Sequence, residues 1–265
     1  MVGATVSLLL LLLGLCTAHK VRKQLWCMDP TEKEDITTTI LRMNNGSSEF
    51  LLEGDLYIPK TRNAMKCLNK AFNCLWPKSS DGKVWIPYII SDKYDAEEND
   101  AIVTAMKDFH GKTCIRFRPR EEERMYLSFQ PRQGCFSAMG RVGEKQVVSL
   151  QRFGCVNHGV IQHELLHALG FYHEHTRSDR DDYITILWEN IIDHHVYNFN
   201  KKDTINLDTP YDYSSIMHYG RDAFGMNRKE TLIPYPDSSV EIGQRDGMSE
   251  IDVLRVNRLY KCHGY

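Results

Sequence analysis

The sequence lacks three features that would each point to a different class of protein. Its 265 residues carry no charge excess, because 33 lysines and arginines face 35 aspartates and glutamates, which gives a net charge of -2. Nucleic-acid binding depends on a basic surface, so this balance argues against such a partner. No repeat or low-complexity tract is present, and no apolar run of membrane-spanning length follows residue 18. We therefore expect one globular domain with flanking segments, and neither a nucleic-acid nor a membrane partner.

The first 18 residues read as a secretory signal peptide. Residues 2–15 are nearly all apolar, which is too short a run for a comfortable membrane span. Cys16 and Ala18 place small residues at the -3 and -1 positions of a cleavage site, although no Lys or Arg precedes the apolar run. The pattern predicts a secreted protein.

Residues 19–62 read as a propeptide, and residues 63–265 as the mature domain. The first of these segments is polar and has no sustained periodicity, so we expect it to be weakly structured. Asn45-Gly46-Ser47 is an acceptor for N-glycosylation. A trypsin-like protease could cut between Arg62 and Asn63 and so release the mature domain.

Cysteine usage agrees with secretion. Of the eight cysteines, Cys16 and Cys27 precede Arg62 and would leave with the removed segments. The even number that remains implies disulfides, although six cysteines allow 15 pairings. These six are Cys67, Cys74, Cys114, Cys135, Cys155 and Cys262.

The pattern of apolar residues predicts an α+β fold. Residues 84–90 favour a strand, which Pro87 would place at a sheet edge or bulge. Ser91 or Asp92 could cap a helix that runs to about residue 110, and Ser249 could cap a final helix carrying Ile251 and Leu254. Further strands are expected at 114–118, 125–129 and 146–150, and a second helix at 159–169. A sheet and two helices thus precede a loop-rich half.

The most informative stretch is His163–His173, which reads H-E-x-x-H-x-x-G-x-x-H. His163 and His167 lie at i and i+4 of the predicted helix, so both imidazoles project from one face and could grip one Zn²⁺. Gly170 can end the helix in the left-handed conformation, after which His173 can return as a third ligand. Three protein ligands leave a position open for water, which is the arrangement of a catalytic zinc site.

The other residues of this constellation complete the chemistry. Glu164 is placed to take a proton from a zinc-bound water. Met217 can form a hydrophobic turn under the metal, and the phenol of Tyr219 can reach its open side. His175 is a weaker candidate, since three nitrogens already suffice. A bare H-E-x-x-H also arises by chance, and an inert secreted binding protein with a protease fold is the rival class; the intact Glu164 argues against it.

Residues 51–262 resemble the astacin family of metzincin metallopeptidases. The resemblance rests on several stretches that occur together, namely residues 163–174, 177–181 and 215–219, Cys135-Phe136-Ser137, Gly140-Arg141, Gln146 and Ser149-Leu150. It implies a two-lobed fold, in which a mixed twisted sheet and the zinc helix lie above a cleft and a loop-rich lobe with a C-terminal helix lies below.

The resemblance also implies roles for individual residues. His163, His167 and His173 would bind one zinc ion per subunit, and Glu164 would be the general base. Tyr219 would be a fifth ligand that swings away and stabilises the oxyanion. Substrate would lie extended along an edge strand near residues 136–138.

The family is held latent by an aspartate in a Phe-x-Gly-Asp motif, which corresponds here to Leu52-Glu53-Gly54-Asp55 with Leu52 in place of the Phe. Asp55 would occupy the open zinc position. Cleavage after Arg62 would make Asn63 the new N-terminus, whose ammonium group would be buried near Glu174.

The resemblance further implies the disulfides Cys114–Cys262 and Cys135–Cys155, and leaves Cys67 and Cys74 to pair with each other. This six-cysteine pattern is similar to the astacins of fish, hatching enzymes among them, and no EGF or CUB module is expected after Tyr265. We therefore expect a monomeric zinc endopeptidase, stored in secretory granules as a zymogen, that digests an egg-envelope glycoprotein. The alternative is a tissue or digestive astacin-like protease with another protein substrate.

Overall fold

The computed structural model describes residues 34–58, 74–244 and 246–265. The predicted signal peptide, the predicted cleavage site at Arg62 and Asn63, and the cysteines Cys16, Cys27 and Cys67 lie outside the described residues. Residues Glu34 to Tyr265 form one compact unit.

A seven-stranded mixed sheet forms the first half of this unit, in the order β1-β2-β6-β7-β5-β3-β4. Strands β7, β5, β3 and β4 are parallel to one another, whereas β6 is antiparallel to β7. The predicted mixed sheet is confirmed. The strands are β1 (Leu51–Leu52), β2 (Leu56–Tyr57), β3 (Val84–Ile90), β4 (Ile115–Pro119), β5 (Tyr126–Gln130), β6 (Cys135–Ser137) and β7 (Lys145–Leu150).

Strand β3 lies inside the sheet, so the expected edge or bulge at Pro87 was wrong. Its pairing with β4 runs without interruption, and Pro87 lies opposite Arg118. The N–H of Val84 points to β4, where it donates to the Cys114 carbonyl. Since N–H groups alternate sides along a strand, the nitrogen of Pro87 faces β5. Pairing with β5 begins only at Tyr88, so no ladder hydrogen bond is lost.

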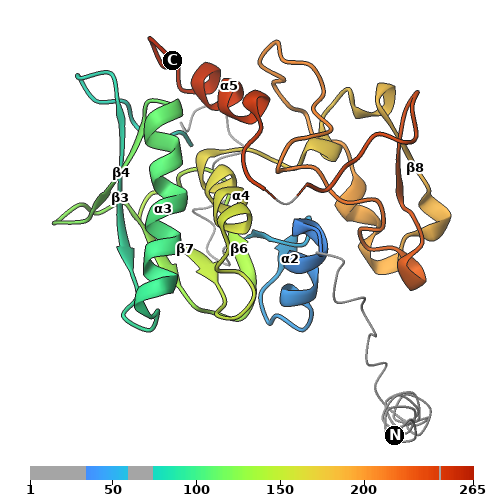
Figure 1. Cartoon of the computed structure of the whole chain (residues 1–265), viewed down its shortest axis with the longest axis horizontal. Coiled ribbons are helices and arrows are strands. Elements are labelled where there is room, and N and C mark those ends of the chain that lie inside the picture. The colour runs from blue at the N-terminus through green and yellow to red at the C-terminus, as the bar shows by residue number, and fades with distance from the viewer. Residues whose placement is uncertain (1–33, 59–73, 245) are drawn as a thin grey trace, which may run out of the picture. The chain divides into compact units, whose positions relative to one another are not determined.

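Two helices, α3 (Ala96–Lys112) and α4 (His158–Leu169), pack beside each other and share one buried apolar cluster with the sheet (Figure 1). The N-cap of α3 is Asp95, not Ser91 or Asp92. The Asp95 carboxylate accepts the Glu98 N–H, and the Glu98 carboxylate accepts the Asp95 N–H, which completes a capping box. Ser91 instead extends the sheet, since its N–H donates to the Phe129 carbonyl.

The second half is loop-rich, as predicted, and has its own small apolar cluster (around β8 in Figure 1). Its regular elements are the two-stranded antiparallel sheet of β8 (Ile184–Ile186) and β9 (Leu232–Pro234), and the short 3-10 turns η2 (Glu174–Thr176), η3 (Arg180–Asp182), η4 (Trp188–Asn190), η5 (Asp193–Phe199) and η6 (Met226–Arg228). The last helix, α5 (Glu250–Leu259), begins at Ser249 as expected.

Within the predicted propeptide, the expectation of weak structure was wrong. Helix α2 (Ile36–Asn44) is capped by Asp35, whose carboxylate accepts the Thr38 N–H at 2.8 Å. Its buried residues include Ile36, Ile40 and Met43, which belong to the main apolar cluster. Figure 1 shows α2 beside β6 and α4. The helix is stabilised by these tertiary contacts, which a reading of local periodicity does not reveal.

Disulfides join distant parts of the unit. Cys114 at the start of β4 is bonded to Cys262 after α5, and Cys135 in β6 is bonded to Cys155. These are the two pairs that the family resemblance implies. Cys74 is also disulfide-bonded, and its expected partner Cys67 lies outside the described residues.

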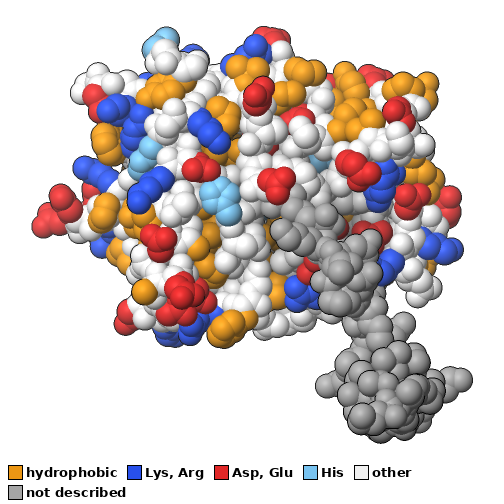
Figure 2. Space-filling view, viewed as in Figure 1, with side chains coloured by type: hydrophobic (Ala, Val, Ile, Leu, Met, Phe, Trp, Pro, Cys, Tyr) orange, Lys and Arg blue, Asp and Glu red, His pale blue; other side chains and the backbone are white. Residues whose placement is uncertain are grey.

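Charged side chains of both signs are interspersed over the face shown in Figure 2. Within the described ranges, no helix is long and apolar enough to cross a membrane.

Candidate metal centre

Helix α4 and the reversal after it bring three histidines together. The helix starts at Asn157, whose side chain accepts the Val160 N–H at 2.9 Å, and ends at Gly170 in the left-handed conformation with φ of 106°. The Phe171 N–H then donates back to the Leu166 carbonyl at 3.0 Å. This tight helix end turns the chain and carries His173 back toward the helix face.

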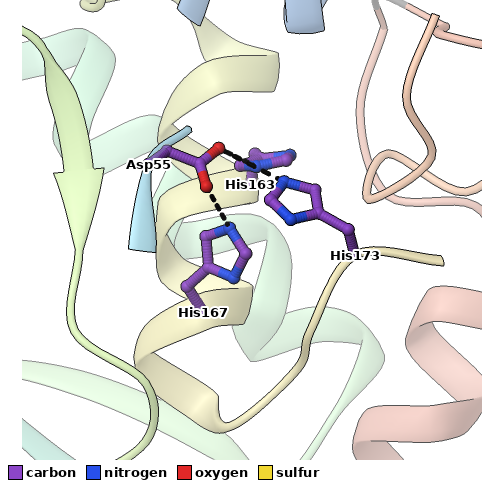
Figure 3. Close-up of side chains that lie close together, drawn as sticks. All are labelled: Asp55, His163, His167 and His173. Atoms are coloured by element: carbon purple, nitrogen blue, oxygen red, sulfur yellow. Dashed lines mark hydrogen bonds and ion pairs between the residues drawn. The ribbon is translucent and has the colours of Figure 1, made fainter. Parts of the chain in front are cut away.

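The imidazoles of His163, His167 and His173 converge on the carboxylate of Asp55 (Figure 3). Their Nε2 atoms lie 3.0, 3.3 and 3.2 Å from the nearest Asp55 oxygen, respectively. All four side chains are buried, and their ligand atoms lie within 4.8 Å of one another. The structure thus gathers four donors of the type that zinc prefers around one point.

The second ring nitrogen of each histidine is already used. Nδ1 lies 2.9 Å from the Ile216 carbonyl in His163, 2.7 Å from the Phe171 carbonyl in His167, and 2.8 Å from the Glu53 carboxylate in His173. Because these oxygens accept, each Nδ1 carries the proton, and a neutral ring keeps its Nε2 lone pair for a metal.

Buried atoms without a partner mark the same point. Among the residues that the structure describes, Asp55 Oδ1 and the Nε2 atoms of His167 and His173 have no hydrogen-bond partner. Buried polar atoms are rarely left in this state, and a bound zinc ion would satisfy all three. The residues present therefore fit zinc.

Glu164 lies one residue beyond the first ligand and is completely buried, with 0% exposure. Neither carboxylate oxygen has a hydrogen-bond partner within the described part of the chain. Burial raises the pKa of this carboxyl well above its usual range, and the nearby Asp55 carboxylate raises it further. Asp55 is the opposite case: burial alone would raise its pKa, but the imidazoles of His173, His167 and His163 lower it well below its usual range. The pKa values of the two neighbouring carboxyls are thus shifted in opposite directions.

Tyr219 lies beside the histidines but is turned onto the N-terminal segment. Its hydroxyl donates to the Glu53 carbonyl, and its ring stacks on His175 with centroids 3.8 Å apart. Burial, together with the Asp55 and Glu53 carboxylates, raises the pKa of Tyr219 well above its usual range, so the hydroxyl keeps its proton. His175 is buried outside the group of four ligands, and its Nε2 donates to the Asn198 carbonyl at 3.1 Å. The role of Tyr219 as a fifth ligand stays a prediction.

The turn that contains Met217 is hydrogen-bonded to the segment of the third histidine and to the ring of His163. The Met217 carbonyl accepts the Glu174 N–H at 2.9 Å, and the preceding Ile216 N–H donates to Asp252 of α5 at 2.9 Å. Glu174 itself is buried. Its carboxylate accepts from the Arg255 guanidinium and from the Asp212 N–H. The structure thus places Glu174, the residue after His173, in a buried ion pair with Arg255.

Reasoning from the sequence missed Glu53. Only Asp55 was singled out in the segment, although Glu53 contacts both His173 and Tyr219. The available signal was an acid two residues before Asp55, next to a glycine that allows a tight turn. The partners are more than 100 residues away in sequence, so this signal alone could not identify them.

A catalytic zinc site of this geometry, on a mixed sheet covered by helices, defines a zinc metalloendopeptidase. Comparison with known families makes the assignment specific, since the model of the peptidase family Astacin matches residues 75–261. The chain belongs to the astacin family.

Proteins that are similar to this chain support the same family assignment. The chain is 63% identical to the low choriolytic enzyme of Oryzias latipes over 235 residues, which cover 89% of this chain and 87% of the relative. It is 55% identical to the high choriolytic enzyme 1 of the same fish over 229 residues, covering 86% and 84% of the two chains. The solved structure of that enzyme, described as a hatching enzyme zinc-protease, matches with a TM-score of 0.70 over 72% of this chain and 96% of its own.

Proposed function

We propose that this protein is a secreted zinc endopeptidase, made as a latent precursor, that digests egg-envelope glycoprotein at hatching. The assignment of the substrate is supported by the 63% identity, over most of both chains, to an enzyme named for choriolysis. We further propose that residues 1–18 direct secretion, that the precursor is stored in secretory granules, and that the enzyme acts as a monomer.

The contacts of the N-terminal segment support latency. Asp55 would be the fourth zinc ligand and so fill the position that the mature enzyme needs for water. Strand β2 pairs with β6 in parallel, with Leu56 opposite Ser137. The side chain of Asn44 accepts the Cys135 N–H at 2.7 Å and donates to the Cys135 carbonyl at 2.6 Å. The segment therefore covers the strand edge along which an extended substrate could pair.

Activation would start with a cut by a trypsin-like protease between Arg62 and Asn63. The loss of residues 1–62 would remove Asp55 and Glu53 from the metal centre and expose the β6 edge. The new ammonium group of Asn63 would then approach Glu174, which is buried behind His173.

The reaction follows from the residues that remain. His163, His167 and His173 would hold the zinc ion, which would supply Lewis-acid chemistry to a water molecule and to the scissile carbonyl. Glu164, released from the Asp55 charge, takes the proton of the attacking water and delivers it to the leaving amine. Tyr219, no longer bonded to Glu53, donates a hydrogen bond to the carbonyl oxygen as negative charge develops there.

The deciding experiment compares two substrates, isolated egg envelope and casein, with chain cleaved after Arg62. A matched Glu164→Gln protein and a zinc chelator are the controls. Swelling or dissolution of the envelope, lost in both controls, is the expected result. Casein cleavage with no effect on the envelope would leave a tissue or digestive peptidase in place of the hatching enzyme. Failure to cleave either substrate, with zinc bound, would point to an inert binding protein.

A further inference from the structure

The turn between β1 and β2 directs two carboxylates at the metal centre. It consists of Glu53, Gly54 and Asp55, and Glu53 and Gly54 both have left-handed backbone conformations, with φ of 52° and 84°. A Cβ on Gly54 would lie 2.4 Å from the end of the Leu41 side chain, and the left-handed φ is itself unfavourable for a residue with a Cβ, so glycine suits this position. For glutamate the left-handed conformation is unfavourable, and such strain persists only where surrounding contacts hold it. We therefore expect Glu53 to be held in this conformation by contacts of its side chain and backbone.

The side chain of Glu53 joins a metal ligand to the loop-rich half. Oε2 accepts the Nδ1–H of His173 at 2.8 Å and lies 3.4 Å from the His173 backbone nitrogen. Oε1 lies 3.2 Å from the Nζ of Lys202. The residue is completely buried, with 0% exposure. A buried carboxylate is stable only when paired, and Lys202 supplies the opposite charge.

The backbone of Glu53 makes two further contacts. Its N–H donates to the Asn198 side chain at 2.8 Å, and its carbonyl accepts the hydroxyl of Tyr219. A phenol has one proton to donate. While Tyr219 donates to Glu53, it cannot donate to the carbonyl oxygen of a substrate.

We propose that Glu53 is a second latency residue, which positions Tyr219 and His173 in the inactive form while Asp55 blocks the metal. The inference rests on the proposed latency of the precursor and adds a separate element to it. Asp55 would remove the site for water, and Glu53 would withdraw the donor that stabilises the oxyanion. Its side chain acts through the turn, because the contacts to His173 and Lys202 hold the carbonyl against Tyr219. Both restraints would leave together when the segment is removed.

The test uses the full chain, zinc-loaded and made uncleavable by Arg62→Gln. Three variants are added singly: Glu53→Ala, Glu53→Gln, and Glu49→Gln as the matched control, since Glu49 of the same segment is only weakly paired, 3.9 Å from Arg132. Asp55→Asn reports on the proposed latency itself. Two quantities are measured, namely hydrolysis of a fluorogenic peptide and the rate of zinc release into a chromophoric chelator.

Glu53→Ala is expected to speed zinc release about tenfold, as the loss of a hydrogen-bond partner of a ligating histidine typically does. Because Asp55 still blocks the site for water in that variant, its effect on peptide hydrolysis is expected in the Asp55→Asn background, where Glu53→Ala should raise hydrolysis above that of Asp55→Asn alone. Glu53→Gln should fall between Glu53→Ala and the parent, because its amide oxygen still accepts from His173 but no longer pairs with the charge of Lys202. Glu49→Gln should match the parent in both measurements.

An internal control separates positioning from misfolding. With Arg62 restored, trypsin cleavage gives the same mature sequence from every variant, so the mature activities must be equal. If Glu53→Ala gives a less active mature enzyme, the substitution has damaged folding of the precursor. The role of Glu53 is then judged from Glu53→Gln alone. Glu53 variants that release zinc as slowly as the parent, and that add no hydrolysis in an active Asp55→Asn background, would overturn the role of Glu53 and leave the latency standing. An uncleaved parent as active as the mature enzyme would instead overturn the proposed latency.

Discussion

Arg255 of α5 and Glu174, the residue after the third histidine, form a buried bidentate ion pair across 81 residues of sequence. Their side chains are 8% and 3% exposed, respectively. The Glu174 N–H donates to the carbonyl of Met217, so the pair also fixes the turn beneath the metal centre. The last helix is therefore tied to the zinc site through a charge that has no access to bulk water.

Removal of one partner should be far more harmful than removal of both. Arg255→Met is expected to lower the free energy of unfolding by about 3–5 kcal/mol, because it removes the bidentate partner of the buried Glu174 carboxylate and leaves only the longer contact to Arg177, at 3.4 Å. Adding Glu174→Gln should recover most of that loss. Chemical denaturation of the two variants and the parent checks this, and a double variant as unstable as Arg255→Met would contradict it.

The two disulfides within the described residues should stabilise the fold to different extents. In the loop-entropy model, the bond Cys114–Cys262, which spans 148 residues, contributes about 5 kcal/mol, and Cys135–Cys155, which spans 20, contributes about 3 kcal/mol. Replacing each pair by alanine and measuring denaturant midpoints tests the order. Equal losses would show that native contacts, not loop length, set the effect.

Zinc should leave the precursor more slowly than the mature enzyme. Asp55 adds a fourth protein ligand to the three histidines, and each extra ligand must also dissociate before the metal escapes. Release into a chromophoric chelator is therefore expected to speed up on cleavage after Arg62. The Asp55→Ala precursor should release zinc faster than the parent precursor but more slowly than the mature enzyme, because Glu53 still accepts from His173. Equal rates for the parent precursor and the mature enzyme would exclude Asp55 as a ligand.

The ring of His175 should matter for turnover more than for binding. It stacks on Tyr219 with an interplanar angle of 27°, and contacts of this kind contribute about 0.5–1.5 kcal/mol. In the mature enzyme, His175→Ala is expected to lower kcat by up to about tenfold with little change in KM, whereas His175→Phe should retain more activity because it keeps a ring. A change in KM alone would assign His175 to substrate binding.

The metal ligands could be predicted because their geometry is local. The i, i+4 spacing of His163 and His167 and the helix end at Gly170 depend only on helix geometry and on one left-handed residue. Strands β4 and β5 and the loop-rich half were likewise recognisable from alternation and from its absence, whereas the mixed sheet was implied by the family resemblance.

Features that depend on distant contacts were not predictable. Helix α5 was expected to bury Ile251 and Leu254, yet Leu254 is 39% exposed, and the buried face carries Asp252, Arg255 and Val256. Apolar periodicity fails there because the charges are paired with groups far away in the sequence. Helix α2 and the position of Pro87 inside the sheet were not predicted for a similar reason, because both depend on contacts with residues far away in the sequence.

Three glycines of the predicted mature domain make room for the predicted propeptide. A Cβ on Gly134 would lie 2.0 Å from the Asn44 side chain, one on Gly154 would lie 2.4 Å from Met43, and one on Gly220 would lie 3.1 Å from Asp35. None of the three is a metal ligand. The residues that accommodate the predicted propeptide therefore differ from those that would bind zinc. Under the proposed latency, a side chain at one of these glycines would alter the contact with the predicted propeptide and leave the metal ligands unchanged.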